Sequence, residues 1–212
     1  MKKKSNNVNN GLKKIKLKLA ILGDSQVGKT NMLYKYVMNK FLENYLATVG
    51  MDHLTKVIKT PKFEIEVQIM DTAGQERYHS IALNSYKSSN GIIFVYDITN
   101  RKSFESLKEW INSTDLLGSI DRVICGNKVD MESKREVSFK ELQTFGSKRQ
   151  IEFFETSAKT GHNIDKAFRR LVDIILENKT DEEIIKEFSL GKKGLTLSSK
   201  KNQKLKEKCC KS

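Results

Sequence analysis

The sequence predicts an α/β protein built on a mostly parallel six-stranded sheet, with one antiparallel edge strand and helices on both faces. Three observations support this prediction. Short apolar runs alternate with amphipathic stretches, a pattern typical of parallel strands joined by helices. Residues 54–70 interrupt the alternation with two strands around a turn near Pro61, which indicates one antiparallel hairpin. A chain of 212 residues is long enough for one buried core and too short for two full domains.

The expected strands are short runs rich in β-branched, aliphatic and aromatic side chains. The first is KLKLAIL at 16–22, and the hairpin ends in VQIM at 67–70. The later strands are IIFVYD at 92–97, RVIC at 122–125 and IEFFE at 151–155. Cys125 lies inside one of these runs, so we expect a buried thiol.

Two helices have clear sequence signals. One begins at Ser138, whose hydroxyl can cap the backbone while Glu141 reaches back to it. The last expected helix is amphipathic, with one apolar face made of Ile164, Ala167, Phe168, Leu171, Val172 and Ile175. Because periodicity fades beyond about residue 180, we expect a basic N-terminal extension at 1–15, a folded domain at 16–178 and a flexible basic tail at 179–212.

The positive charge is concentrated at the two ends of the chain. The whole sequence carries +13, whereas residues 1–18 and 192–212 carry +7 each, which leaves −1 for the part between them. Basic ends on a nearly neutral body favour an anionic membrane surface over nucleic acid, which requires positive charge on a shaped surface. Lysines that only solvate the two ends are the alternative.

Neither a membrane span nor a signal peptide is expected. No stretch approaches the roughly 20 apolar residues that a spanning helix requires, and lysines interrupt the apolar run after the basic start. The sequence therefore predicts a cytosolic protein. Three cysteines are too few for a disulfide framework, and the adjacent Cys209 and Cys210 stand too near the end to serve packing.

The loop after the first strand, GDSQVGKT at 23–30, has the pattern G-x-x-x-x-G-K-[ST] between a strand and a helix. Gly23 and Gly28 allow the backbone to wrap a phosphate chain, and the amides that open the next helix point at the anion. Lys29 supplies charge to the terminal phosphates, and the Thr30 hydroxyl can bind magnesium. A glycine-rich turn that merely opens a helix is the alternative.

The third strand ends in DTAGQE at 71–76. Asp71 stands where its carboxylate can hold magnesium through water. Gly74 can bring its amide against a terminal phosphate, and the Gln75 amide can orient an attacking water. Gln75 without its flanking pattern is an ordinary exposed loop glutamine.

Two further loops indicate that the base is guanine. In NKVD at 127–130, the Asp130 carboxylate can accept from the adjacent N–H and NH₂ groups of guanine, whereas adenine leaves it unpaired. ETSAK at 155–159 offers Ser157 and the Ala158 amide to the rim of the purine.

These four motifs, in this order and spacing, resemble the Ras superfamily from about residue 16 to residue 178, and the cysteine-ending tail is most similar to that of the Rab family. The resemblance implies a P-loop GTPase domain. It implies that Phe41 stacks on guanine, that Tyr45 closes over the phosphates and that Thr48 binds magnesium in the GTP state. Segments 41–53 and 71–86 are then two switches, ordered by the third phosphate and released on hydrolysis.

The resemblance also implies the set of site residues and partners. Residues assigned to GTP or GDP are Gly23, Ser25, Gln26, Val27, Gly28, Lys29, Thr30, Asn31, Phe41, Tyr45, Thr48, Gly74, Asn127, Lys128, Asp130, Ser157, Ala158 and Lys159. The Mg²⁺ ligands are Thr30, Thr48 and Asp71, and the catalytic residue is Gln75. Expected partners are an exchange factor, a GTPase-activating protein, an escort protein or GDP-dissociation inhibitor, and effectors, with no nucleic acid.

The ending CCKS resembles the paired-cysteine Rab termini that receive two geranylgeranyl groups, here on Cys209 and Cys210. A C-a-a-X site at Cys209 is the alternative, disfavoured by Lys211 at a position that is usually aliphatic. Leu195 and Leu197 resemble a tail element that contacts the escort protein, or are incidental. The expected location is the cytoplasmic face of an endomembrane, and residues 36–56 look most like late-endosomal Rabs.

Three departures from the family pattern affect function. Gln26 stands where glycine or alanine is usual, and His53 and Met70 replace two aromatic residues of the switch surface. The first departure opens an alternative, a hydrolysis-impaired protein that stays GTP-bound and acts as a scaffold. A soluble Ran-like transport GTPase or basic nucleic-acid binder is a third possibility, which the terminal cysteine pair disfavours.

Overall fold

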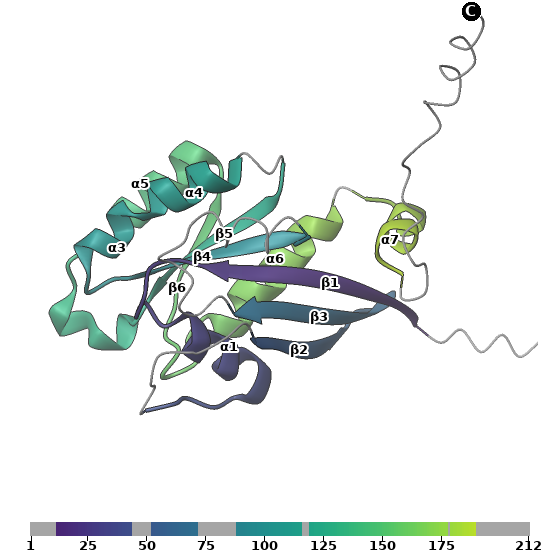
Figure 1. The fold of residues 1–212 in the computed structure, drawn as a ribbon, viewed down its shortest axis with the longest axis horizontal. Helices are drawn as coiled ribbons and strands as arrows, with labels where there is room; N and C mark the ends of the chain where they lie inside the picture. Colours follow the sequence, from purple (N-terminus) through teal and green to yellow (C-terminus); the bar gives the residue numbers. More distant parts are fainter. Residues whose placement is uncertain (1–11, 44–51, 72–87, 116–118, 178, 190–212) are drawn as a thin grey trace, which may run out of the picture.

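The protein folds around one six-stranded sheet (Figure 1). This computed structural model describes residues 12–43, 52–71, 88–115, 119–177 and 179–189. The strands are β1 (Lys13–Leu22), β2 (Asp52–Lys59), β3 (Phe63–Asp71), β4 (Gly91–Asp97), β5 (Asp121–Asn127) and β6 (Glu152–Glu155). Their order across the sheet is β2-β3-β1-β4-β5-β6. Only β2 runs antiparallel to its neighbour, so the predicted sheet and its edge hairpin are confirmed.

Helices cover both faces of the sheet, as the alternating pattern predicted (Figure 1). On one face α1 (Lys29–Met38) and α6 (Ile164–Glu177) pack in one apolar cluster, and α3 (Arg101–Glu105), α4 (Leu107–Asp115) and α5 (Phe139–Arg149) pack in the other. A 3-10 helix, η1 (Val129–Lys134), follows β5. No helix in these ranges is long and apolar enough to cross a bilayer.

Residue-level predictions for the core are confirmed. All six apolar residues of the α6 stripe are buried, and Cys125 is fully buried. The Tyr36 ring of α1 stacks on Phe168 of α6, with ring centroids 4.0 Å apart and planes 8° from parallel. This pair joins α1 to α6, and burial raises the pKa of the Tyr36 hydroxyl.

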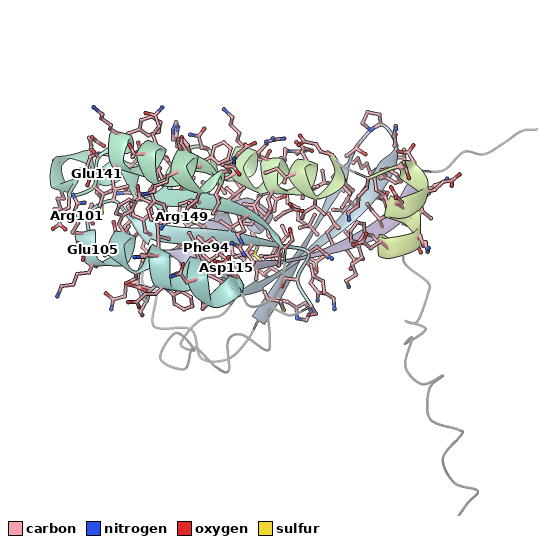
Figure 2. The ribbon with its side chains drawn as sticks, turned by 90° about the horizontal axis from the view of Figure 1, so that it is seen from above. Phe94, Arg101, Glu105, Asp115, Glu141 and Arg149 are labelled. Carbon is pink, nitrogen blue, oxygen red and sulfur yellow. The ribbon has the colours of Figure 1, made fainter. Side chains whose placement is uncertain are left out.

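The predicted capping box begins α5. The Ser138 hydroxyl accepts from the Glu141 amide at 3.3 Å, and the Glu141 carboxylate accepts from the Ser138 amide at 3.0 Å. Arg101, at the start of α3, lies 2.5 Å from the same carboxylate (Figure 2). Hydrogen bonds from Arg101 and from Ser138 lower the pKa of the Glu141 carboxyl to about 2. The first turn of α5 is thereby attached to the start of α3 on the same face of the sheet.

The structure differs from the sequence-based boundary at residue 179. A further helix, α7 (Asp181–Phe188), lies where the flexible tail was expected to begin. Its Ile184 and Phe188 are 4% and 5% exposed, and Ser189 forms an antiparallel bridge to Ile15 of β1. The partly buried Ile185 packs against the same core, and three apolar residues are too few to show periodicity. Contacts with β1 stabilise a helix of a length that is marginal in isolation.

We expect Phe188→Ala to lower the free energy of unfolding by about 3 kcal/mol, because a nearly buried ring is lost and a cavity remains. Urea unfolding in excess GDP and magnesium measures the change. Glu182→Ala in the same helix is the control, because Glu182 is exposed and an exposed change shifts stability by about 0.5 kcal/mol or less. Equal midpoints for the two variants would contradict the packing of α7.

Candidate nucleotide-binding site

Residues 23–28 form a tight loop between β1 and α1, and Lys29 and Thr30 begin the helix, as predicted. Gly23 has φ +145, and a Cβ built there would lie 2.0 Å from the Val95 carbonyl oxygen of β4, so only glycine fits. The Lys29 ammonium donates to the carbonyl oxygens of Gly23 at 2.8 Å and Asp24 at 2.7 Å. Lys29 is 6% exposed. The loop therefore curls around its own lysine, the arrangement expected of a phosphate-binding loop.

Gln26 occupies an unusual backbone conformation in this loop. Its φ is +65, in the left-handed region that favours glycine, and its side chain is exposed. Ser25 is exposed as well, whereas Val27 is buried. The departure noted at Gln26 therefore coincides with backbone strain at the tip of the loop.

A hydrogen bond not predicted from sequence attaches this loop to α4. The Trp110 indole nitrogen donates to the Asp24 carboxylate at 2.8 Å, and Trp110 is 4% exposed. The two residues are 86 positions apart, so no local pattern could have indicated the contact. The bond fixes the outer side of the phosphate loop against a helix on the opposite face of the sheet from α1.

Asn127 connects three of the four predicted loops. Its amide nitrogen donates to the Val27 carbonyl at 2.9 Å, and its side-chain oxygen accepts from the Ala158 amide at 3.1 Å. Asn127 is 1% exposed, so these bonds are shielded from water. The segments 23–30, 127–130 and 155–159 are therefore held in one place at the carboxyl ends of β1, β5 and β6.

Asp130 lies next to Ser157. The Ser157 hydroxyl donates to one carboxylate oxygen of Asp130 at 2.6 Å, and Asp130 itself is exposed. Ser157 and Ala158 are buried, whereas Lys159 is exposed. One exposed carboxylate, oriented by a buried hydroxyl, is the arrangement that the guanine prediction requires.

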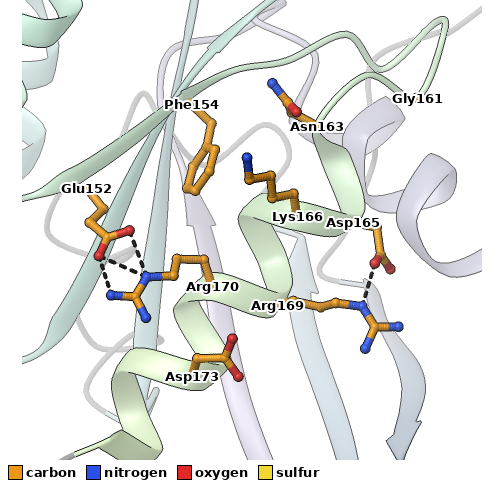
Figure 3. Close-up of a pocket in the computed structure, with 9 residues that line it drawn as sticks. All are labelled: Glu152, Phe154, Gly161, Asn163, Asp165, Lys166, Arg169, Arg170 and Asp173. Atoms are coloured by element: carbon orange, nitrogen blue, oxygen red, sulfur yellow. Dashed lines mark hydrogen bonds and ion pairs between the residues drawn. The ribbon is translucent and has the colours of Figure 1, made fainter.

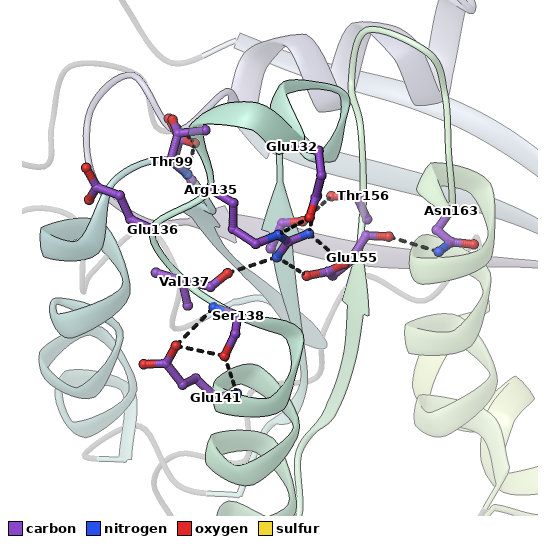
Figure 4. Close-up of polar contacts among 12 residues, drawn as sticks. Thr99, Glu132, Arg135, Glu136, Val137, Ser138, Glu141, Glu155, Thr156 and Asn163 are labelled. Atoms are coloured by element: carbon purple, nitrogen blue, oxygen red, sulfur yellow. Dashed lines mark hydrogen bonds and ion pairs between the residues drawn. The ribbon is translucent and has the colours of Figure 1, made fainter.

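Arg135 braces the two base-side loops (Figure 4). Its guanidinium donates to Glu132 of η1 at 2.7 Å, to Glu155 of β6 at 2.5 Å and to the Val137 carbonyl at 2.8 Å. Hydrogen bonds to Glu132 and Glu155 raise the pKa of Arg135. Asn163 donates to the Glu155 carbonyl at 2.9 Å from the other side. The role of Arg135 was not predicted from the sequence, because hydrogen bonds between segments far apart in the chain produce no recognisable residue spacing.

Thr30 and Asp71 lie at the same end of the sheet. Thr30 is the second residue of α1 and is 7% exposed, and Asp71 ends β3 and is 2% exposed. In the parallel register Asp71 lies opposite Ile21 of β1, just before the phosphate loop. The structure therefore brings two of the three predicted magnesium ligands to the loop 23–30.

Asn31 and Phe41 are involved in holding the chain after α1. The Asn31 side chain accepts from the Leu42 amide at 3.0 Å and donates to the Leu42 carbonyl at 3.3 Å. Phe41 packs, partly buried, against the core. The Asn31 side chain is therefore engaged by Leu42, and a contact between Asn31 and a nucleotide would be made by its backbone.

Several predicted residues lie outside the described ranges. These are Tyr45, Thr48, Gly74, Gln75, Cys209 and Cys210. Of the altered switch-surface positions, His53 is exposed on β2 and lies opposite Met70 of β3 in the antiparallel register.

A surface hollow of about 710 Å³ lies away from these loops, between β6 and α6 (Figure 3). Arg170 pairs with Glu152, and Arg169 pairs with Asp165. Its acidic and basic side chains balance, so the hollow has no charge preference for a phosphate or a cation. The loops at the carboxyl ends of the strands remain the candidate site.

The fold and these loops define the class as a P-loop GTPase. The model of the Ras family matches residues 18–177. Ras-related protein Rab-10 of Diplobatis ommata is 41% identical over 168 residues, covering 78% of this chain and 84% of that protein. The Ypt/Rab-type GTPase Rab7 of Gibberella zeae is 42% identical over 185 residues, covering 84% and 88%. Rab-1C of Dictyostelium discoideum is 42% identical over 161 residues, covering 75% and 80%.

The chain belongs to the Ras family, and within it to the Rab small GTPases. Members of this family bind guanine nucleotides, hydrolyse GTP and act as molecular switches in membrane trafficking. The chain is therefore a GTPase.

Proposed function

We propose that the chain is a magnesium-dependent switch that recruits effectors to the cytoplasmic face of an endomembrane while GTP is bound. The observation that best supports this proposal is the position of Asn127. The buried Asn127 amide, itself in the loop 127–130, bonds to the phosphate loop 23–30 and to the loop 155–159. The proposed phosphate and base sites are therefore held together as one unit. A preassembled site binds tightly because little ordering remains to be done on binding.

Guanine is selected by Asp130 in this proposal. Ser157 donates to one oxygen of the carboxylate, and the exposed carboxylate can still accept from the N–H and NH₂ of the base. Adenine presents no such pair of donors. Leaving the carboxylate unmatched would cost about 1–3 kcal/mol or more.

Mg²⁺ fits the residues present. The Thr30 hydroxyl and the Asp71 carboxylate are buried oxygen donors at one end of the sheet, and Thr48 is proposed as the third ligand from its motif. Magnesium prefers oxygen and keeps water and phosphate oxygens in its remaining positions. When bound, the ion would neutralise phosphate charge.

Hydrolysis and switching are assigned to residues of the two switch segments. Gln75 orients the attacking water, Thr48 and Gly74 bind the terminal phosphate, and Tyr45 closes over it. Effectors, an exchange factor, a GTPase-activating protein and an escort protein or GDP-dissociation inhibitor are the proposed partners. Because His53 and Met70 form a cross-strand pair in place of a phenylalanine and a tryptophan, effectors with polar or flexible contact residues suit this surface.

Membrane attachment is assigned to the C-terminal tail. Cys209 and Cys210 are proposed to carry geranylgeranyl groups, and the net charge of +7 over residues 192–212 adds attraction to anionic lipid. Ser189, the residue before the tail, pairs with the start of β1 and so lies at the opposite end of that strand from the phosphate loop. A late-endosomal compartment is proposed from residues 36–56 alone. Unchanged membrane association in the double variant Cys209→Ser/Cys210→Ser would overturn the lipid anchor.

A GTP-bound scaffold is the second candidate, favoured by one observation. Gln26 has a positive φ and an exposed side chain at the tip of the phosphate loop. Its side chain can obstruct an activating protein or displace the attacking water.

GTP turnover by the purified chain with magnesium distinguishes the two candidates. We expect slow wild-type hydrolysis that Gln75→Leu abolishes, because the substitution removes the water-orienting amide. Gln26→Gly is the matched comparison, since glycine accepts a positive φ without strain. Tight GTP binding without turnover in the wild type, together with turnover in Gln26→Gly, would identify the scaffold and overturn the switch.

A further inference from the structure

Asp97, the last residue of β4, is a buried carboxylate with both oxygens engaged. It is 6% exposed. One oxygen accepts from the Thr99 amide at 2.9 Å and from the Thr99 hydroxyl at 2.8 Å, and the other lies 2.6 Å from the Lys128 ammonium. The Asp97 amide also donates to the Ser103 hydroxyl at 3.0 Å. The position of the carboxylate is therefore fixed by these bonds. Breaking the ion pair would leave a buried charge unpaired, which is costly.

Lys128 extends from the base-side loop toward the phosphate loop. It follows Asn127, has φ 72 in the left-handed region, and directs its ammonium to Asp97. A Cβ built on Gly28 would lie 4.0 Å from the Lys128 Cε atom, so the end of the stem passes beside the phosphate loop. The side chain nevertheless stays 30% exposed. Part of the apolar stem is thus open to a ligand while its charged end is held.

We propose that Asp97 is a positioning residue that holds the Lys128 stem as one wall of the guanine slot before nucleotide binds. The inference rests on the proposed function, because it takes Lys128 as a nucleotide contact. A lysine stem has many rotamers, and an ion pair that selects one of them removes the ordering cost from binding. Asp97 does this without touching the nucleotide.

Release of fluorescent GDP from the full chain with magnesium tests the proposal. We expect Asp97→Asn to speed release about tenfold, since losing one partner of a buried charge pair acts mainly on dissociation. Lys128→Met keeps the stem and removes the charge, and should give a similar increase. In the double variant release should be no faster than in Lys128→Met, because both changes remove one interaction. Thr99→Val, which removes one donor to Asp97 and keeps the ion pair, is the control and should leave release unchanged.

Each outcome separates the inference from the function on which it rests. Additive increases in the double variant would mean that Asp97 acts only on the fold, and would overturn the proposal. Wild-type release in Asp97→Asn would do the same. Unchanged release in Lys128→Met would overturn both the proposal and the assignment of Lys128 to the nucleotide, while GTP turnover would still test the switch. If Asp97→Asn does not fold, Lys128→Arg serves in its place, because it keeps the positive charge that pairs with Asp97. GDP release from Lys128→Arg as fast as from Lys128→Met would then overturn the proposal.

Discussion

Asp130→Asn is expected to weaken GDP binding about a thousandfold and to create a preference for the xanthine nucleotide. In the proposed site the carboxylate accepts two hydrogen bonds from guanine, and bonds to a charged group contribute about 1.5–3 kcal/mol each. An amide presents one donor and one acceptor, which matches the N–H and the C2 carbonyl of xanthine. Competition between GDP and xanthosine diphosphate for the magnesium-loaded site measures the change.

Ser157→Ala is the matched control for this exchange of specificity. It removes the hydroxyl that donates to Asp130 at 2.6 Å and leaves the carboxylate itself in place. We expect a loss of GDP affinity of about tenfold, corresponding to 1.4 kcal/mol, with guanine still preferred over xanthine. Guanine preference retained in Asp130→Asn would show that another group recognises the base.

Phe168→Ala is expected to lower the free energy of unfolding by about 4 kcal/mol. A large buried side chain leaves a cavity, and its stacking on Tyr36 at 4.0 Å is lost with it. Urea unfolding with excess GDP and magnesium gives the measurement. The loss should fall on the whole domain, because the pair joins α1, which begins in the phosphate loop, to α6.

Tyr36→Phe is the control that keeps the stacked rings. Within the described part of the chain the Tyr36 hydroxyl is buried without a hydrogen-bond partner. Removing a buried, unsatisfied hydroxyl should leave stability unchanged or raise it by about 1 kcal/mol. A large loss in Tyr36→Phe would show that the hydroxyl contributes a contact, and a small loss in Phe168→Ala would show that the two helices are joined elsewhere.

Strands and long helices were predictable because each has a local cause. Apolar runs of four to seven residues and the stripe from Ile164 to Ile175 identify buried elements whatever surrounds them. The capping box at Ser138 is equally local. Helix α7 was missed because its apolar face has only Ile184, Ile185 and Phe188, and its partner is the start of β1, far away in the sequence.

The functional loops, too, have features with a local cause in the sequence and features that depend on tertiary contacts. The sequence by itself determined which residue types stand after each strand, and from these it predicted a phosphate loop at 23–30 and a guanine-selecting aspartate at 130. Only the tertiary structure decided how those loops are held, through Asn127 on Val27 and Ala158, and Trp110 on Asp24. The physical reason is that these bonds join groups 31 to 100 positions apart, and such pairs meet only after the sheet has aligned its strands.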